Sequence, residues 1–134
     1  MRWLIHYFQR RAAQRLLGAP LPSDASDLHF VKYRVSSDLA GYDAYIKFRA
    51  SRPSFLALVR QRGLALSGGG IPSAHLPTAW RLPPGSKAVE WWDAGVDTPA
   101  DSASGSVGVF GWIVAKHEHG CVYVIISDTG HRKS

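Results

Sequence analysis

The sequence predicts an α+β fold: an antiparallel sheet of about four to five strands, a packed helix over residues 52–62 and an N-terminal amphipathic helix over residues 2–17. Two observations support this fold class. Apolar residues recur at helical spacing in both helical segments, and β-prone segments come in pairs separated by short turns. The 134 residues are enough for one domain, so we divide the chain into an N-terminal helix, 1–18, and a single α+β domain, 19–134.

The N-terminal helix is predicted from a repeating apolar pattern with a cationic polar side. Its apolar residues recur every three or four positions: Trp3, Leu4, Tyr7, Phe8, Ala12 and Leu16. Gly18 and Pro20 end it. Such a helix either packs on the core of its own protein or binds a membrane surface or a partner groove, and packing is the commoner case.

The second helix, 52–62, carries the clearest signals in the chain. Ser51 is a favourable N-cap, Pro53 suits the first turn, and Gly63 is the expected end. Phe55 and Val59, four positions apart, belong to its predicted buried stripe.

The strands are predicted as hairpins. Residues 29–35 and 43–50 are β-prone and joined by a turn over 36–42. The polar face of this first hairpin is expected to carry Lys32, Arg34, Lys47 and Arg49. Strands over 107–116 and 121–128, joined by a turn at 117–120, form the terminal hairpin.

The middle of the chain is predicted to be mostly irregular. Residues 64–87 are rich in Gly and Pro, and residues 93–106 are a loop of small and acidic residues. Between them, residues 88–92 form a short predicted strand. Two long loops in a small domain are typical of a functional region or of tolerance to insertion.

The positive charge is concentrated in the first half of the chain. The net charge is +6, yet residues 1–62 hold 11 Lys and Arg against 4 Asp and Glu. This asymmetry indicates either an anionic partner or a solvated surface that keeps the protein soluble.

Cys121 is the only cysteine, so the chain cannot form an internal disulfide. No apolar run approaches the roughly 20 residues of a membrane span, and the N-terminus does not have the pattern of a signal peptide. We therefore expect a cytoplasmic location; a periplasmic one stays open if a signal was removed.

The polar residues of the terminal turn are the main candidates for a metal site. His117, His119 and Cys121 are zinc-ligand types at alternate positions, but Gly120 is expected to break the alternation and a fourth ligand is missing. We expect no zinc site, no cofactor and a buried, structural Cys121.

Tryptophan and arginine in the middle region favour a contact surface. Trp91 and Trp92 are adjacent, so on a strand one ring would enter the core and the other would face outward, near Trp80 and Arg81. In the first hairpin, aromatic and basic residues alternate as in platforms that bind single-stranded nucleic acid, with Tyr45 beside Lys47 and Arg49.

The order of motifs from Leu21 onward resembles a family layout. A Leu-Pro pair and an Asp/Ser spacer precede a strand, followed by YIKFRAS, FLALVRQRGL and, later, WWD before the terminal hairpin. This layout is similar to that of some bacterial toxin-immunity proteins and small lipoprotein-like proteins, which implies a non-enzymatic function. The lipid-attachment cysteine of the lipoprotein-like members is absent here, which argues against envelope anchoring.

The function expected from these observations is protein binding without catalysis, most concretely neutralisation of a toxin by an immunity protein. The expected contact residues are Trp80, Arg81, Trp91, Trp92, Lys47 and Arg49. One alternative is nucleic-acid binding by the basic N-terminal half, and another is a small enzyme with its site in the middle loop. The sequence leaves the partner and the oligomeric state open.

Overall fold

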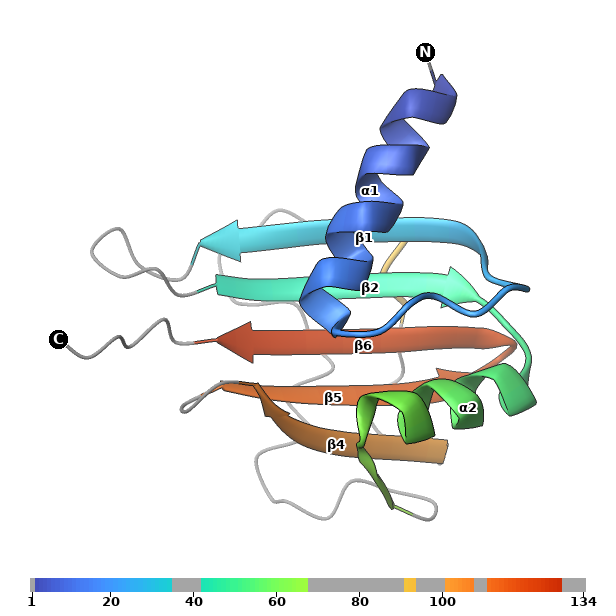
Figure 1. Cartoon of the computed structure of the whole chain (residues 1–134), viewed down its shortest axis with the longest axis vertical. Coiled ribbons are helices and arrows are strands. Elements are labelled where there is room, and N and C mark those ends of the chain that lie inside the picture. The colour runs from blue at the N-terminus through green and yellow to red at the C-terminus, as the bar shows by residue number, and fades with distance from the viewer. Residues whose placement is uncertain (1, 35–41, 68–90, 94–100, 108–110, 129–134) are drawn as a thin grey trace, which may run out of the picture.

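One six-stranded antiparallel sheet, with two helices on the same face, forms the framework of the protein in a computed structural model (Figure 1). The structure describes residues 2–34, 42–67, 91–93, 101–107 and 111–128. The described elements follow the order α1 (Arg2–Leu17), β1 (Ser26–Arg34), β2 (Tyr42–Arg49), α2 (Arg52–Arg62), β3 (Ala65–Ser67), β4 (Asp101–Val107), β5 (Gly111–Glu118) and β6 (Cys121–Asp128). The α+β class and the antiparallel sheet are confirmed, whereas the predicted four to five strands are too few.

The strand order in the sheet is β1-β2-β6-β5-β4-β3. Two hairpins, β1–β2 and β5–β6, therefore lie next to each other, with β6 paired to β2 along its whole length. The β5–β6 turn is shorter than predicted, because β5 extends to Glu118 and only His119 and Gly120 connect the strands. Both have positive φ, 54° and 76°, as a two-residue type I′ turn requires.

Two strands occupy segments that the sequence had predicted to be irregular. β4 occupies the end of the predicted loop 93–106 and the first residue of the predicted strand 107–116, while β3 lies in the predicted irregular region 64–87. The strand predicted over 107–116 is observed as β5, over Gly111–Glu118. The predicted strand 88–92 is wrong where it can be checked, because Trp91 lies in a turn and Trp92 in neither a helix nor a strand. Residues 88–90 and most of the predicted turn over 36–42 lie outside the described residues.

The main core lies between the sheet and the two helices. Alternate residues of β2 and β6 point to this side, which we call the helix face: Ala44, Ile46, Phe48, Val122, Val124 and Ile126. In α2, Phe55, Leu58 and Val59 pack against it. The helix begins at an N-cap in which the Ser51 hydroxyl accepts a bond from the Ser54 amide, and it ends at Gly63, as predicted.

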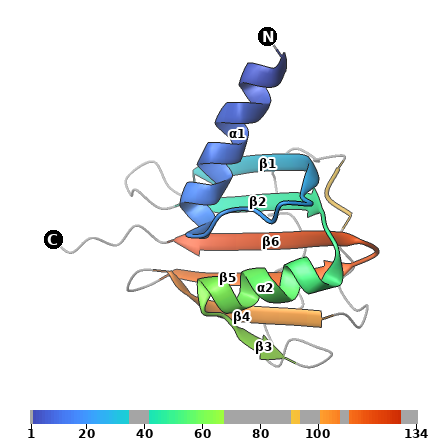
Figure 2. The ribbon, with the colours of Figure 1, turned by 45° about the vertical axis from the view of Figure 1, so that its right-hand side comes forward.

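The N-terminal helix packs on the sheet through only its second half. Ala13 and Leu17 are completely buried in the core, and the end of the helix lies over β1 and β2 (Figures 1 and 2). Its first half projects beyond the edge strand β1 in both views. The expected packing of residues 2–17 on the core is thus confirmed for the second half of the helix.

The opposite side of the sheet, which we call the back face, has its own smaller cluster. Tyr45, Val114, Cys121, Tyr123 and Ile125 are buried there, and Trp91 and Trp92 pack against them. Cys121 is buried and unpaired, as predicted. The sheet is therefore covered on both faces near its centre, which explains the continuous apolar character of β6.

Candidate functional site

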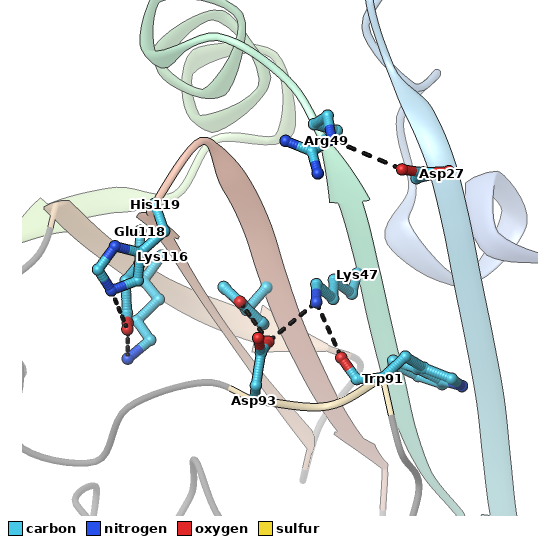
Figure 3. A network of polar contacts seen from close by, with 9 residues as sticks. Asp27, Lys47, Arg49, Trp91, Asp93, Lys116, Glu118 and His119 are labelled. Atoms are coloured by element: carbon cyan, nitrogen blue, oxygen red, sulfur yellow. Dashed lines mark hydrogen bonds and ion pairs between the residues drawn. The ribbon is translucent and has the colours of Figure 1, made fainter.

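The structure brings together three of the six residues predicted to bind a partner. Lys47, Trp91 and Trp92 meet on the back face, while Arg49 lies further along β2 and pairs with Asp27 at the surface, Nε to Oδ2 3.5 Å (Figure 3). Trp80 and Arg81 lie outside the described residues. The candidate site is thus the place where residues 91–93 cross the back face of β2 and β6.

Lys47 holds this segment on the sheet. Its Nζ donates to the Trp91 carbonyl and to Asp93 Oδ1, each at 2.9 Å (Figure 3). The Lys47 side chain is 17% exposed and that of Asp93 66%, so the ion pair lies at the boundary between sheet and solvent. A cation with both an anionic and a carbonyl acceptor fixes the backbone of this segment.

Asp93 is also bound from the sheet by Tyr123. The buried Tyr123 hydroxyl donates to Asp93 Oδ1 at 2.5 Å. This bond and the one from Lys47 lower the pKa of the Asp93 carboxyl. Burial raises the pKa of the Tyr123 phenol, and the neighbouring carboxylate raises it further. Asp93 is therefore held ionised and Tyr123 neutral.

Five aromatic rings surround this polar contact, and we call them the back-face aromatic cluster: His29, Tyr45, Trp91, Trp92 and Tyr123. The His29 and Trp91 rings are stacked, with centroids 5.1 Å apart. Trp92 meets Tyr45 at 5.1 Å and Tyr123 at 5.3 Å, both edge to face. These are favourable geometries for aromatic pairs, so each indole has a fixed position.

Exposure divides the cluster into a floor and a rim. Tyr45 and Tyr123 are buried at 3% and 1%, whereas Trp91 and Trp92 are both partly exposed. The prediction that one tryptophan enters the core and the other faces solvent is wrong. Residues 91 and 92 lie outside the sheet, and both side chains pack against its back face. The two indoles form the outer surface of the site.

A buried ion pair lies on the same face of β5. Lys116 Nζ is 2.6 Å from Glu118 Oε1, and the two side chains are 3% and 4% exposed. Residues two apart on a strand share a face, which brings them together. His119 lies 3.4 Å from the other Glu118 oxygen (Figure 3). This pair could not be predicted from the sequence, since two charged residues in a hairpin normally indicate a solvated surface.

A second surface lies on the projecting half of α1. Tyr7 and Phe8 are 48% and 59% exposed, with ring centroids 5.6 Å apart. The Arg11 guanidinium lies over the Tyr7 ring and donates to its hydroxyl at 3.3 Å. The helical periodicity in the sequence placed these residues in the apolar pattern of the helix. It could not show that the sheet ends before it reaches them.

The basic surface predicted for the first hairpin is wrong. Lys32 pairs with Ala44 and therefore shares the helix face, whereas Lys47 and Arg49 are on the back face. The register places Arg34 opposite Tyr42 at the end of the hairpin. The register over His29–Arg34 is regular and pairs even-numbered residues of β1 with even-numbered residues of β2, so Lys32 and Lys47 face opposite sides. Alternation within each strand could not reveal this register.

The three candidate metal ligands of the terminal turn are not brought together. His117 lies on the helix face, where its Nε2 is 2.9 Å from the Ala50 carbonyl oxygen, and Cys121 is buried on the back face. His119 is in the exposed turn. Within the described part of the chain, no group of three or more His, Cys, Asp or Glu residues is arranged to hold a metal ion. Nor does any described helix have the length and apolar character needed to cross a membrane.

In comparisons with known proteins, no family model, curated protein or solved structure matches the chain.

Proposed function

We propose that the protein is a non-enzymatic protein-binding module, most concretely a bacterial immunity protein that neutralises a partner toxin. The observation that carries the proposal is the pair of partly exposed tryptophans held in place at the surface of the back face. Tryptophan is enriched among the residues that contribute most to protein–protein binding energy.

The fixed positions of the indoles support this proposal. Association normally costs free energy because interface side chains lose rotational freedom. Here the Trp91 ring is already stacked on His29, and Trp92 is already wedged against Tyr45 and Tyr123. A partner that covers them would therefore pay little of that cost, and the charged Lys47–Asp93 pair beside them would supply a polar rim.

The burial of Tyr45 weighs against the nucleic-acid alternative. Base stacking requires an accessible aromatic face, and at 3% exposure Tyr45 has none. Lys47 is already paired with Asp93, and Arg49 with Asp27. For the enzyme alternative, residues 68–90 of the middle loop lie outside the described part of the chain.

Affinity capture from the native host with full-length protein as bait tests the proposal, using nuclease-treated lysate and mass spectrometry. The captured protein is then purified and its affinity measured for each variant. Trp91→Ala should weaken binding by about 2 kcal/mol or more, the range typical of interface tryptophans. Thermal unfolding of the same samples shows whether the variant stays folded.

Trp112→Ala is the matched control, because Trp112 is an exposed tryptophan on β5, where it pairs with Ser127 at the far end from the turn. We expect its affinity to equal that of the wild type. Equal affinity of the folded Trp91→Ala variant would disprove the proposed surface. Loss of all captured partners on nuclease treatment would favour nucleic acid instead.

A further inference from the structure

The first half of α1 extends beyond the sheet and exposes the aromatic rings of Tyr7 and Phe8. The second half is anchored through Ala13 and Leu17, and the helix then leaves the sheet past β1 (Figure 2). Tyr7 and Phe8 are the two large apolar side chains exposed on this part among the residues whose side chains are described. Nothing in the core requires them there.

The projecting half of this helix is mostly apolar and has arginine at both ends. The sequence places Trp3, Leu4, Ile5, Tyr7 and Phe8 there, together with His6. Arg2 precedes this stretch, Arg10, Arg11 and Arg15 follow it, and the first acidic residue of the chain is Asp24. The helix thus has an apolar tip, residues 3–8, and a cationic collar, residues 10–15.

We propose that the apolar tip of α1 inserts shallowly into an anionic phospholipid surface, with the cationic collar at the level of the headgroup phosphates. At a bilayer surface an apolar boundary lies next to an anionic phosphate layer, which suits an apolar stretch with arginines on either side. Arginine is well suited to this layer, because its guanidinium binds phosphate with two parallel hydrogen bonds.

The charge of the helix supports an anionic lipid surface. Residues 2–23 contain four arginines and no acidic residue, so this part of the chain is complementary to a layer of phosphates. The Arg11 contact with the Tyr7 ring places a cation directly behind the tip.

Sedimentation of the full-length protein with vesicles tests this proposal. One vesicle preparation contains phosphatidylglycerol mixed with phosphatidylcholine, and the other contains phosphatidylcholine alone. We expect binding to the anionic vesicles that falls as salt is raised, and at least tenfold weaker binding to the neutral ones. Equal binding to both would overturn the role of the collar, and absence of binding to anionic vesicles at low salt would overturn the whole proposal.

Two variants with matched controls locate the contact. Phe8→Ser should reduce vesicle affinity severalfold, while Leu66→Ser, which changes a side chain of similar exposure on β3, should not. Arg11→Gln should reduce it about fivefold, as expected for one cation near an anionic surface, while Arg60→Gln on the exposed side of α2 should not. Thermal unfolding confirms that each variant is folded.

The inference is independent of the proposed protein-binding function. Trp91→Ala should leave vesicle binding unchanged, and Phe8→Ser should leave capture of the soluble partner unchanged. If Phe8→Ser abolished partner capture but not vesicle binding, the tip would be a protein contact and the membrane proposal would be wrong.

Discussion

At the scale of single residues, Lys47 was expected to be a surface charge, but its side chain binds residues 91–93 to the sheet. Sequence alternation placed it correctly on the polar side of β2. It could not reveal Asp93, which is 46 positions away in the chain and bonded at 2.9 Å. The same carboxylate accepts from Tyr123, so one acidic side chain joins two strands to residues 91–93.

The lowered pKa of Asp93 predicts sensitivity to acid. The folded pKa lies below the ordinary value of 3.8, so the carboxylate stabilises the fold above that pH and this contribution is lost as pH falls through the folded pKa. Asp93→Asn should therefore show a smaller loss of melting temperature than the wild type between about pH 5 and pH 2.

Asp27→Asn is the control for this experiment, since the ion pair between Asp27 and Arg49 is exposed at the surface. It should retain nearly the full acid response of the wild type. Asp24 and Asp101 also have lowered pKa values and should leave a residual response in every variant. Identical pH profiles for Asp93→Asn and the wild type would contradict the assigned role of Asp93.

At the scale of elements, α2 was predicted within its observed bounds because its signals are local. Ser51, Pro53 and Gly63 each act on a neighbouring backbone group, so they can be recognised in the sequence without knowledge of the fold. The strand β4 was missed for the opposite reason. Its residues are small and polar, and they form a strand because β5 pairs with them along the whole segment.

The fold also explains why β4 has a glycine at position 105. Leu64, which follows α2, lies directly over Gly105, and a Cβ at that position would come 2.6 Å from the Leu64 Cδ2 atom. The candidate site was only partly predictable: Lys47 was identified from the alternation of β2, and the two tryptophans from their residue type and adjacency. Asp93 and Tyr123 joined them only through tertiary pairing.

The β5–β6 turn gives a prediction at this scale. Gly120 has a φ of 76° with no atom near the position of a Cβ, so Gly120→Ala tests backbone strain alone. It should destabilise the fold by about 1–2 kcal/mol in chemical denaturation. His119→Asn should have no such cost, because asparagine tolerates positive φ at this turn position. Equal stability of Gly120→Ala and the wild type would exclude the type I′ turn.

At the scale of the whole molecule, Arg62 connects elements that the sheet alone does not hold together. Its Nε donates to the Leu17 carbonyl at the end of α1, 2.8 Å, and its Nη2 to the Ser106 carbonyl of β4, 3.0 Å. One side chain of α2 thus links the helix that lies over β1 and β2 to a strand on the other side of β6.

Removing this link should destabilise the fold. Arg62→Met keeps most of the aliphatic side chain but loses both hydrogen bonds, and should lower the free energy of unfolding by about 1.5–3 kcal/mol. Arg60→Met, an exposed neighbour on the same helix, should change it by less than about 0.5 kcal/mol. Urea denaturation of both variants measures the difference. An equally small effect of Arg62→Met would show that the packing of Leu17 and Ala13 alone fixes α1.

The central place of β6 has a consequence for the order in which the chain can fold during synthesis. β6 is the last of the described strands to leave the ribosome, yet the β1–β2 hairpin joins β5 and β4 only through it. Until residues 121–128 emerge, the inner edges of β2 and β5 have no sheet partner among the described strands, and such edges readily pair with other chains. The nascent protein should therefore depend on chaperone protection until residues 121–128 have emerged, and the sheet should close in one step after that.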